Sequence, residues 1–329
     1  KKIESAIREH NKRNMYDGQI HDIEGVTKVV KEVKGELEEK LGIELKKASI
    51  AAAGRALKTN RINIEKQIDS TVEISRQMIE ALELEGIQKA EDLLIKEKDR
   101  NDFKYYCIGY SVVNYYLDEG FIENLEGHKG EKMGIDILAT FLPQIVVDSL
   151  YAVVSRAGLQ VSNITLEPIA AINVAIKENL RLLNLALVDI GAGTSDIAIT
   201  KDGTIVAYAM TSTAGDELTE SLSRNFLLDF NSSEKLKVKL NSQETHEFND
   251  IVGVVHRLST DEIISSIEDV IDKLAREISE EIIKYNGKSP SAVFLIGGSS
   301  QIPKLNEHIA KYLKLPKERV AIRDASHIE

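Results

Sequence analysis

The stretch LALVDIGAGTSDIAI, residues 185–199, decides the fold prediction, because two apolar strands enclose a glycine-rich turn with an acid on either side. Glycines let backbone N–H groups approach a ligand closely, and successive amides in a tight turn form an anion-binding nest. Carboxylates beside a phosphate would repel it unless a cation lay between them. The stretch therefore predicts a phosphate site with Mg²⁺, held by Asp189 and Asp196 through water, because Mg²⁺ loses its hydration shell reluctantly.

Within this turn, Gly191 and Gly193 are the predicted amide donors, and Thr194 adds a hydroxyl. The turn is followed by a second hairpin turn at 201–203 and a return strand over 204–212. This strand–turn–strand order differs from the strand–loop–helix order of a Walker-type phosphate loop. The alternative is an ordinary hairpin that is rich in glycine and aspartate without binding anything.

Length and composition restrict the class of protein. The 329 residues suit two lobes or a domain with an insertion, and a formal net charge of −11 argues against nucleic-acid binding. A single cysteine, Cys107, excludes an internal disulfide framework and fits a reducing cytoplasm. No stretch has the ~20 apolar residues of a membrane span, and no signal peptide is recognisable. We expect Cys107 to be a buried small hydrophobic residue.

Apolar periodicity gives the organisation of the chain. Helices are predicted over 21–42 and 260–285, the second starting with a capping box formed by Ser259 and Glu262. Residues 55–141 differ in composition from the rest of the chain: five of the ten tyrosines lie within 105–116, which favours strands. We interpret this block as a small α+β module inserted into a larger fold, with the tyrosines on a packed sheet face.

Two further segments carry acids or glycines at the start of a predicted helix. Glu167 lies where a strand meets a helix, so it could orient a water for attack on a phosphoryl group, or be an acid favoured by the helix dipole. The segment TAGDELTESL, 213–222, would point a helix N-terminus at an anion through Gly215 and Asp216, or be a plain connecting loop.

The remaining candidate segments suit a nucleoside. At Gly297 and Gly298 a base or ribose could lie flat on the backbone, although a tight connection explains these glycines equally well. Glu234 and Lys237 are three residues apart on a predicted helix. They could contact ribose or adenine, or form a surface ion pair that contributes little.

In combination these segments resemble the actin-like ATPase superfamily, which includes actin, the DnaK-type chaperones, sugar kinases and bacterial actin homologues. The resemblance covers about 145–310 and rests on five segments in order: LEPIAA, VDIGAGTSD, TAGDELTESL, SEKLK and FLIGGSSQIPKL. The first half, with GQIHDIEGVTKVV, ASIAAAGRA and PQIVVDSLYAVVSRAGLQVSNITLEP, is similar to the FtsA-type cell-division actins and the PilM pilus-assembly proteins. These carry an inserted subdomain in the first lobe.

The resemblance implies a two-lobed α/β fold of duplicated ribonuclease-H-like domains with an inserted α+β subdomain. Its expected boundaries are 1–54 and 142–181 for the first lobe, 55–141 for the insertion and 182–329 for the second lobe. It assigns catalytic roles to Glu167, which would position water, and to Asp189. It places Asp189 and Asp196 at the Mg²⁺ ion. It assigns the phosphates to Gly191, Gly193 and Thr194, with Gly215 and Asp216 beside phosphates or ribose. It assigns the nucleoside to Glu234, Lys237, Gly297, Gly298 and Ser299.

Three departures from the family are visible. The first phosphate hairpin of the family is missing before residues 1–18, and its last helix is missing after Glu329, so we expect truncated termini. Ala192 stands where the family more commonly has glycine. The C-terminal amphipathic helix through which FtsA relatives attach to membranes is not seen.

The expected function is that of an FtsA-type, ATP- and Mg²⁺-dependent scaffold in cell division, at most a slow ATPase. We expect self-association into dimers or filaments, with the bacterial tubulin homologue or the cytoplasmic tail of a membrane protein as further partners. The expected location is the cytoplasm, peripheral at the inner face of the membrane, without nucleic acid. The alternatives are a PilM-like scaffold that binds a membrane-protein peptide and a chaperone-like ATPase of the same fold.

Overall fold

The computed structural model describes residues 3–10, 14–16, 19–52, 57–96 and 104–323. Its contacts divide the chain into two compact units, 1–167 and 168–329. The domain boundaries predicted from the sequence stay a prediction.

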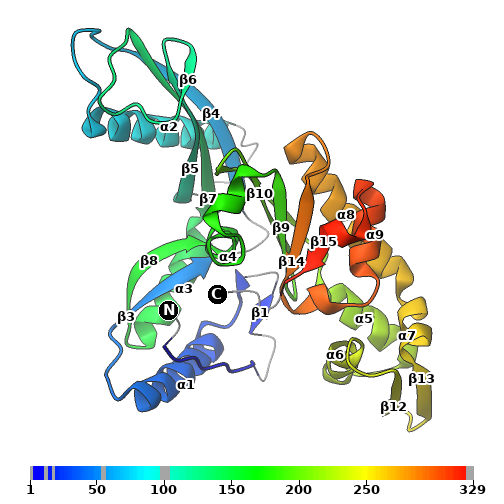
Figure 1. Cartoon of the computed structure of the whole chain (residues 1–329). Coiled ribbons are helices and arrows are strands. Elements are labelled where there is room, and N and C mark those ends of the chain that lie inside the picture. Colours follow the sequence, from blue (N-terminus) through cyan, green and yellow to red (C-terminus); the bar gives the residue numbers. More distant parts are fainter. Residues whose placement is uncertain (1–2, 11–13, 17–18, 53–56, 97–103, 324–329) are drawn as a thin grey trace. The chain divides into compact units, whose positions relative to one another are not determined.

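The first unit contains two layered parts (Figure 1). One part pairs β3 (Lys47–Ala52) and β8 (Gln160–Leu166) in parallel, together with α1 (Ile23–Leu41) and α3 (Gln144–Arg156), which contact each other. A short antiparallel pair, β1 (Met15–Tyr16) and β2 (Gln19–Ile20), precedes α1. The helix predicted over 21–42 is confirmed: Asp22 accepts a hydrogen bond from Gly25 N–H, and Gly42 ends the helix at φ +67°.

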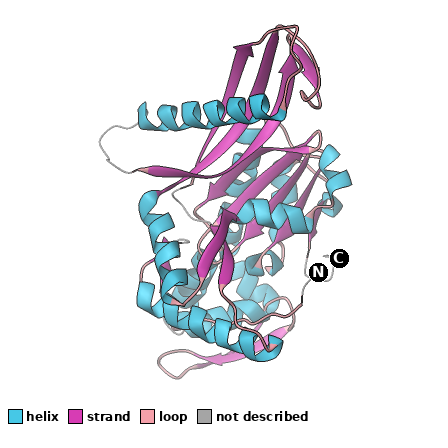
Figure 2. Ribbon diagram, turned by 90° about the vertical axis from the view of Figure 1, so that its left-hand side faces the viewer, coloured by secondary structure: helices cyan, strands magenta, loops and turns pink. Residues whose placement is uncertain are grey.

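The other part is an antiparallel sheet in the order β4-β7-β5-β6, with α2 (Arg76–Lys96) packed on one face (Figures 1 and 2). Its strands are β4 (Lys58–Gln67), β5 (Tyr105–Leu117), β6 (Gly120–Ile122) and β7 (Lys132–Pro143). This sheet and helix fall largely within 55–141, the segment predicted to be an inserted α+β module, and its insertion stays a prediction. Tyr110 and Tyr115 donate hydrogen bonds from β5 to Glu83 of α2, which ties the tyrosine-rich strand to the helix.

Cys107 is half-buried on β5, and burial raises the pKa of its thiol. The thiolate, which is the reactive form, is therefore less populated at pH 8 in the folded protein than in the unfolded chain. We expect alkylation by iodoacetamide at pH 8 to be at least about tenfold slower in the native protein than in urea. Equal rates, measured by mass spectrometry, would contradict this assignment.

The second unit is built on a five-stranded sheet in the order β11-β10-β9-β14-β15. Strands β9 (Leu185–Ile190), β14 (Ala292–Ile296) and β15 (Val320–Ile322) are parallel, and β10 (Ser195–Lys201) runs antiparallel to β9 and β11 (Thr204–Thr211). Asp202 and Gly203 both have positive φ, so the predicted hairpin turn is confirmed. The segment α4 (Glu167–Ala175) and a 3₁₀ turn at Glu178–Leu182 lead into this sheet.

Helices α5 (Gly215–Phe226), α6 (Phe230–Lys239), α7 (Thr260–Ser266), α8 (Glu268–Asn286) and α9 (Leu305–Leu313) accompany the sheet. A hairpin of β12 (Thr245–Asn249) and β13 (Val255–Ser259) and 3₁₀ turns at Gly298–Gln301 and Lys317–Arg319 complete the unit. Apolar residues of α8 and the strands, such as Ile271, Leu274, Val188 and Ile197, form one core. Among the described helices, none is both long and apolar enough to cross a bilayer.

The single helix predicted over 260–285 is wrong, because the structure breaks it at Ile267. The Asn225 side chain donates a hydrogen bond to the carbonyl of Ser266, and the Ser266 hydroxyl donates one to the carbonyl of Ile263. The N–H of Ile267 then bonds to Ile264 in a 3₁₀ turn. Side chains that enter the backbone ladder in this way kink a helix, although the apolar period continues across the break. The predicted capping box of Ser259 and Glu262 is confirmed.

Candidate functional site

The glycine-rich turn between β9 and β10 closes on itself and brings its two acids together. The N–H of Gly191 donates to the carbonyl of Thr194 at 3.0 Å, and strand pairing places Asp189 directly opposite Asp196. The Thr194 hydroxyl donates to Asp196 Oδ2 at 3.1 Å, and both residues are buried. Two carboxylates on neighbouring strands thus lie at one end of the sheet.

Asp189 is the unsatisfied member of this pair. Within the part of the chain that the structure describes, no hydrogen bond or ion pair holds its carboxylate, and burial raises its pKa. A half-buried carboxylate without a partner is a strained arrangement that a cation would relieve. This chemistry fits a hydrated Mg²⁺. Among the described residues no cluster of three or more His, Cys, Asp or Glu side chains could hold a metal, so such an ion would keep most of its waters.

Two other segments are anchored on the carbonyl of Gly191. It accepts hydrogen bonds from Gly215 N–H at the start of α5, at 3.1 Å, and from Ser299 Oγ after β14, at 2.9 Å. The N–H of Asp216 bonds to the carbonyl of Ala192 at 2.7 Å. Three segments that are far apart in sequence therefore meet at one backbone oxygen. The backbone N–H groups of Gly215 and Asp216 thus already donate to carbonyls of the turn. The predicted role of these two residues at an anion stays a prediction.

Two glycines near this junction are required by packing. A Cβ at Gly215 would collide with Ser299 Oγ and would lie 2.9 Å from the carbonyl oxygen of Gly191. Gly297 has φ +85°, a conformation in which other residues are strained. A Cβ there would collide with Asp189 Oδ1 and lie 2.5 Å from the carbonyl oxygen of Ile190. These close approaches explain both glycines without a ligand.

Glu234 and Lys237 form a partly buried ion pair on α6, with Nζ and Oε2 2.7 Å apart. The Lys237 ammonium also lies 2.9 Å from Thr219 Oγ1 and donates to the carbonyl of Gly215 at 3.1 Å. Only 6% of the Lys237 side chain is exposed, against 40% for Glu234. The pair is therefore not the exposed surface pair that the sequence left open. It attaches α6 to the start of α5.

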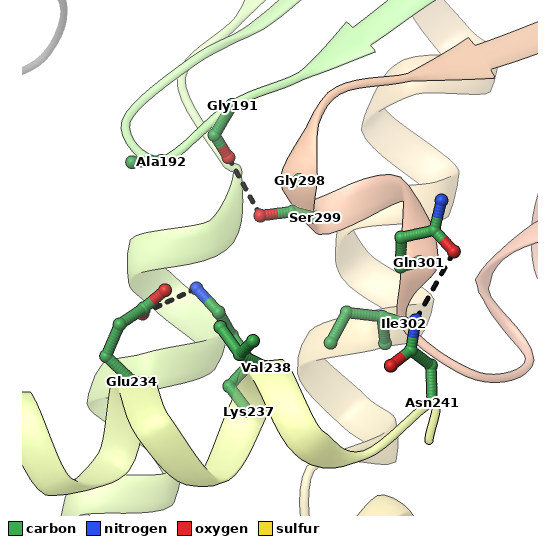
Figure 3. Close-up of a pocket in the computed structure, with 10 residues that line it drawn as sticks. All are labelled: Gly191, Ala192, Glu234, Lys237, Val238, Asn241, Gly298, Ser299, Gln301 and Ile302. Carbon is green, nitrogen blue, oxygen red and sulfur yellow. Dashed lines mark hydrogen bonds and ion pairs between the residues drawn. The ribbon is translucent and has the colours of Figure 1, made fainter. Parts of the chain in front are cut away.

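A cavity of about 410 Å³ opens between α6, the glycine turn and the segment after β14 (Figure 3). This volume is in the range of small-molecule sites. The lining residues are Gly191, Ala192, Glu234, Lys237, Val238, Asn241, Gly298, Ser299, Gln301 and Ile302. Gly298 differs from its neighbour, because a Cβ there would meet no atom within 4 Å.

The structure brings together five of the predicted residues in this cavity: Gly191, Glu234, Lys237, Gly298 and Ser299. Those that adjoin it without lining it are Asp189, Gly193, Thr194, Asp196, Gly215, Asp216 and Gly297. Glu167, the first residue of α4, falls in the other unit, so its catalytic role stays a prediction.

Sequence reasoning missed several wall residues, among them Val238, Asn241 and Gln301. The side-chain amide of Asn241 donates to Gln301 Oε1 at 3.3 Å across the cavity edge. Asn241 follows Lys237 by four residues and lies in the turn just after α6 ends, so its closeness in sequence to Lys237 was the available signal. Val238 is 65% exposed, an apolar surface of the kind that a flat ring covers.

Comparison with known proteins finds similarity to FtsA cell division proteins. The family model described as "Cell division protein FtsA" matches residues 186–327. The FtsA cell division protein of Streptococcus pneumoniae is 24% identical over 311 residues, which cover 90% of this chain and 65% of that protein. FtsA of Escherichia coli K12 is 23% identical over 314 residues, covering 89% of this chain and 72% of that protein. The chain thus spans about two thirds of the length of the streptococcal relative.

Two solved structures share the fold. The PilM–PilN type IV pilus biogenesis complex matches with a TM-score of 0.68 at 15% identity, over 95% of this chain and 79% of the other. The ethanolamine utilization protein EutJ from Carboxydothermus hydrogenoformans matches with a TM-score of 0.52 at 19% identity, over 94% and 72% of the two chains. At these identities the likeness shows the fold alone.

Proposed function

We infer that this chain, a member of the actin-like ATPase superfamily that is similar to FtsA cell division proteins, is an FtsA-type nucleotide-binding scaffold. One observation carries this inference: the turn, the start of α5 and the segment after β14 are joined at the Gly191 carbonyl, beside a cavity. The resemblance assigns all three of these segments to ATP.

ATP or ADP would lie with its nucleoside in the cavity and its phosphates toward the turn. Gly298 and Val238 offer flat or apolar surface to the base, while Glu234 offers carboxylate oxygens to the ribose or adenine edges. Lys237 keeps Glu234 in place through their ion pair. Gly193 and Thr194 are in the turn and Gly215, Asp216 and Gly297 adjoin it, which supports the phosphate end of the assignment.

A bound Mg²⁺ would offset the charge of the phosphates against Asp189 and Asp196. Asp189 has the unpaired carboxylate that such an ion needs, and Asp196 is held by Thr194 so that its orientation is set in advance. Hydrolysis would be slow at most, with Glu167 positioning the attacking water. The partners would be a second copy, the bacterial tubulin homologue or a membrane-protein tail, at the cytoplasmic face of the membrane.

Gly298→Ala tests the nucleoside end of this proposal. The added methyl meets no protein atom within 4 Å, so the fold should persist, but the methyl would occupy the space of a bound base. We expect the affinity for ATP, measured by calorimetry on the full-length protein in Mg²⁺, to fall at least about tenfold, which corresponds to ~1.4 kcal/mol. Gly35→Ala on α1, which also meets nothing within 4 Å, is the matched control. If both variants bind ATP with equal affinity, the base does not lie against Gly298.

A further inference from the structure

Strand β4 leaves one of its edges unpaired. It is the outer strand of the sheet β4-β7-β5-β6, and no other strand pairs with it in the part of the chain that the structure describes (Figure 1). Its ten residues, KTNRINIEKQ, match β7 in a continuous register without a bulge. Natural sheets protect such edges with proline, bulges or inward charges, because alternate backbone N–H and C=O groups point outward. A long, regular edge like this one can accept another strand.

The side chains of β4 divide cleanly between the two faces of the sheet. Ile62 and Ile64 are buried in the core under α2. Arg61, Asn63 and Glu65 alternate with them and lie on the other face, with 49% of the Arg61 side chain and 48% of the Glu65 side chain exposed.

We propose that β4 pairs antiparallel with β4 of a second copy of this chain, about a two-fold axis that passes through Asn63. The segment Arg61-Ile62-Asn63-Ile64-Glu65 is self-complementary around its centre. In this register Arg61 lies opposite Glu65 of the second copy, Ile62 opposite Ile64, and Asn63 opposite itself. The two-fold symmetry makes the Arg61–Glu65 and Ile62–Ile64 pairs each occur twice, with the Asn63 pair on the axis, as an isologous interface requires.

Charge and side-chain alternation favour this arrangement over a parallel pair and over a shift by one residue. Arg61 donates from Nε to Asp136 at 3.0 Å, and Glu65 is 3.0 Å from Lys132 Nζ. Pairing Arg61 with Glu65 of the second copy extends these ion pairs into a row of alternating sign. A parallel, in-register pair would instead place like charges together. A shift by one residue would move the isoleucines to the polar face.

The pairing also continues the apolar core. Ile62 and Ile64 would contact their counterparts beneath the two α2 helices, so that two four-stranded sheets form one eight-stranded sheet. Lys66 and Glu85, 3.5 Å apart, bridge β4 and α2 above this seam. The interface deepens the second-copy partner of the proposed function, but it involves no residue of the nucleotide site, so its failure would leave the nucleotide-binding proposal untouched.

Cross-linking of the full-length protein tests the register. With Asn63→Cys, a short bifunctional thiol reagent should produce a covalent dimer, because cross-strand Cβ atoms are ~5 Å apart. Thr59→Cys alone should not, because two copies of residue 59 would be ~27 Å apart at 3.4 Å per residue. A mixture of Thr59→Cys and Gln67→Cys should cross-link, since 59 and 67 face each other. The unaltered protein controls for Cys107.

Sedimentation without nucleotide tests the charges. Glu65→Arg places like charges opposite each other twice, and we expect at least about tenfold weaker dimerisation, with Glu65→Gln intermediate. The proposal is overturned if the protein stays monomeric at 200 µM (a concentration of order 10⁻⁴ M that reveals weak contacts). It is equally overturned if Thr59→Cys cross-links as well as Asn63→Cys does.

Discussion

Asp189→Asn is expected to make the nucleotide-free protein more stable while weakening its binding of Mg-ATP about 10–100-fold, the usual cost of losing an outer-shell partner of a metal. Burial raises the pKa of the Asp189 carboxyl, and no partner among the described residues stabilises its charged form. At neutral pH the ionised carboxylate therefore costs folding free energy, which asparagine avoids.

The pH dependence has a definite sign. Because the folded-state pKa of Asp189 is raised, the contribution of Asp189 to the free energy of unfolding is most favourable below its unfolded-state pKa of about 3.9. That contribution is lost as the pH rises through the folded-state value. The stabilisation of Asp189→Asn over the parent protein should thus be present at pH 7 and vanish at pH 4 in thermal scans without nucleotide.

Asp202→Asn is a matched control for this experiment. Asp202 lies in the hairpin turn at the opposite end of β10, its side chain is 79% exposed, and its φ of +52° is one that asparagine also adopts. It should leave both the melting temperature and the Mg-ATP affinity unchanged. If Asp189→Asn binds Mg-ATP as well as Asp202→Asn does, Asp189 has no place in a metal site.

Gly297→Ala is expected to unfold the second unit or to lower its melting temperature by more than about 10 °C. The alanine would have to adopt φ +85° and ψ +160°, which costs on the order of 1–3 kcal/mol. Its Cβ would also collide with Asp189 and with the carbonyl of Ile190, backbone that the central sheet holds in place. Overpacking adds about 1–3 kcal/mol, and each kcal/mol shifts the melting temperature by ~2–4 °C in a unit of this size.

Calorimetric scans of Gly297→Ala and Gly298→Ala side by side measure this effect. The two changes add the same methyl one residue apart, but the methyl at 298 enters open space. Hydrogen exchange of the Gly297→Ala protein should show that the backbone amides of β9 and β14 lose the most protection. A melting temperature of Gly297→Ala within 2 °C of that of Gly298→Ala (a difference of under about 1 kcal/mol) would contradict the packing argument.

Local patterns predicted several elements of the second unit. The apolar stretches on either side of the two turns around 185–212 predicted β9, β10 and β11, and the Ser259–Glu262 capping box located the start of α7. The break at Ile267 was not predictable from its neighbours, because Asn225, 41 residues earlier, supplies the hydrogen bond that disrupts the helix.

The sequence by itself determined which chemistry the turn can support. Glycines that expose amides, a threonine hydroxyl and two acids are local properties of 189–196, and they act through groups a few residues apart. Tertiary structure alone decided which glycines face the cavity. Gly297 and Gly298 are indistinguishable as letters, yet one packs against Asp189 and the other opens to the cavity. The same holds for Lys237, whose burial comes from contacts with Gly215 and Thr219 that only long-range packing creates.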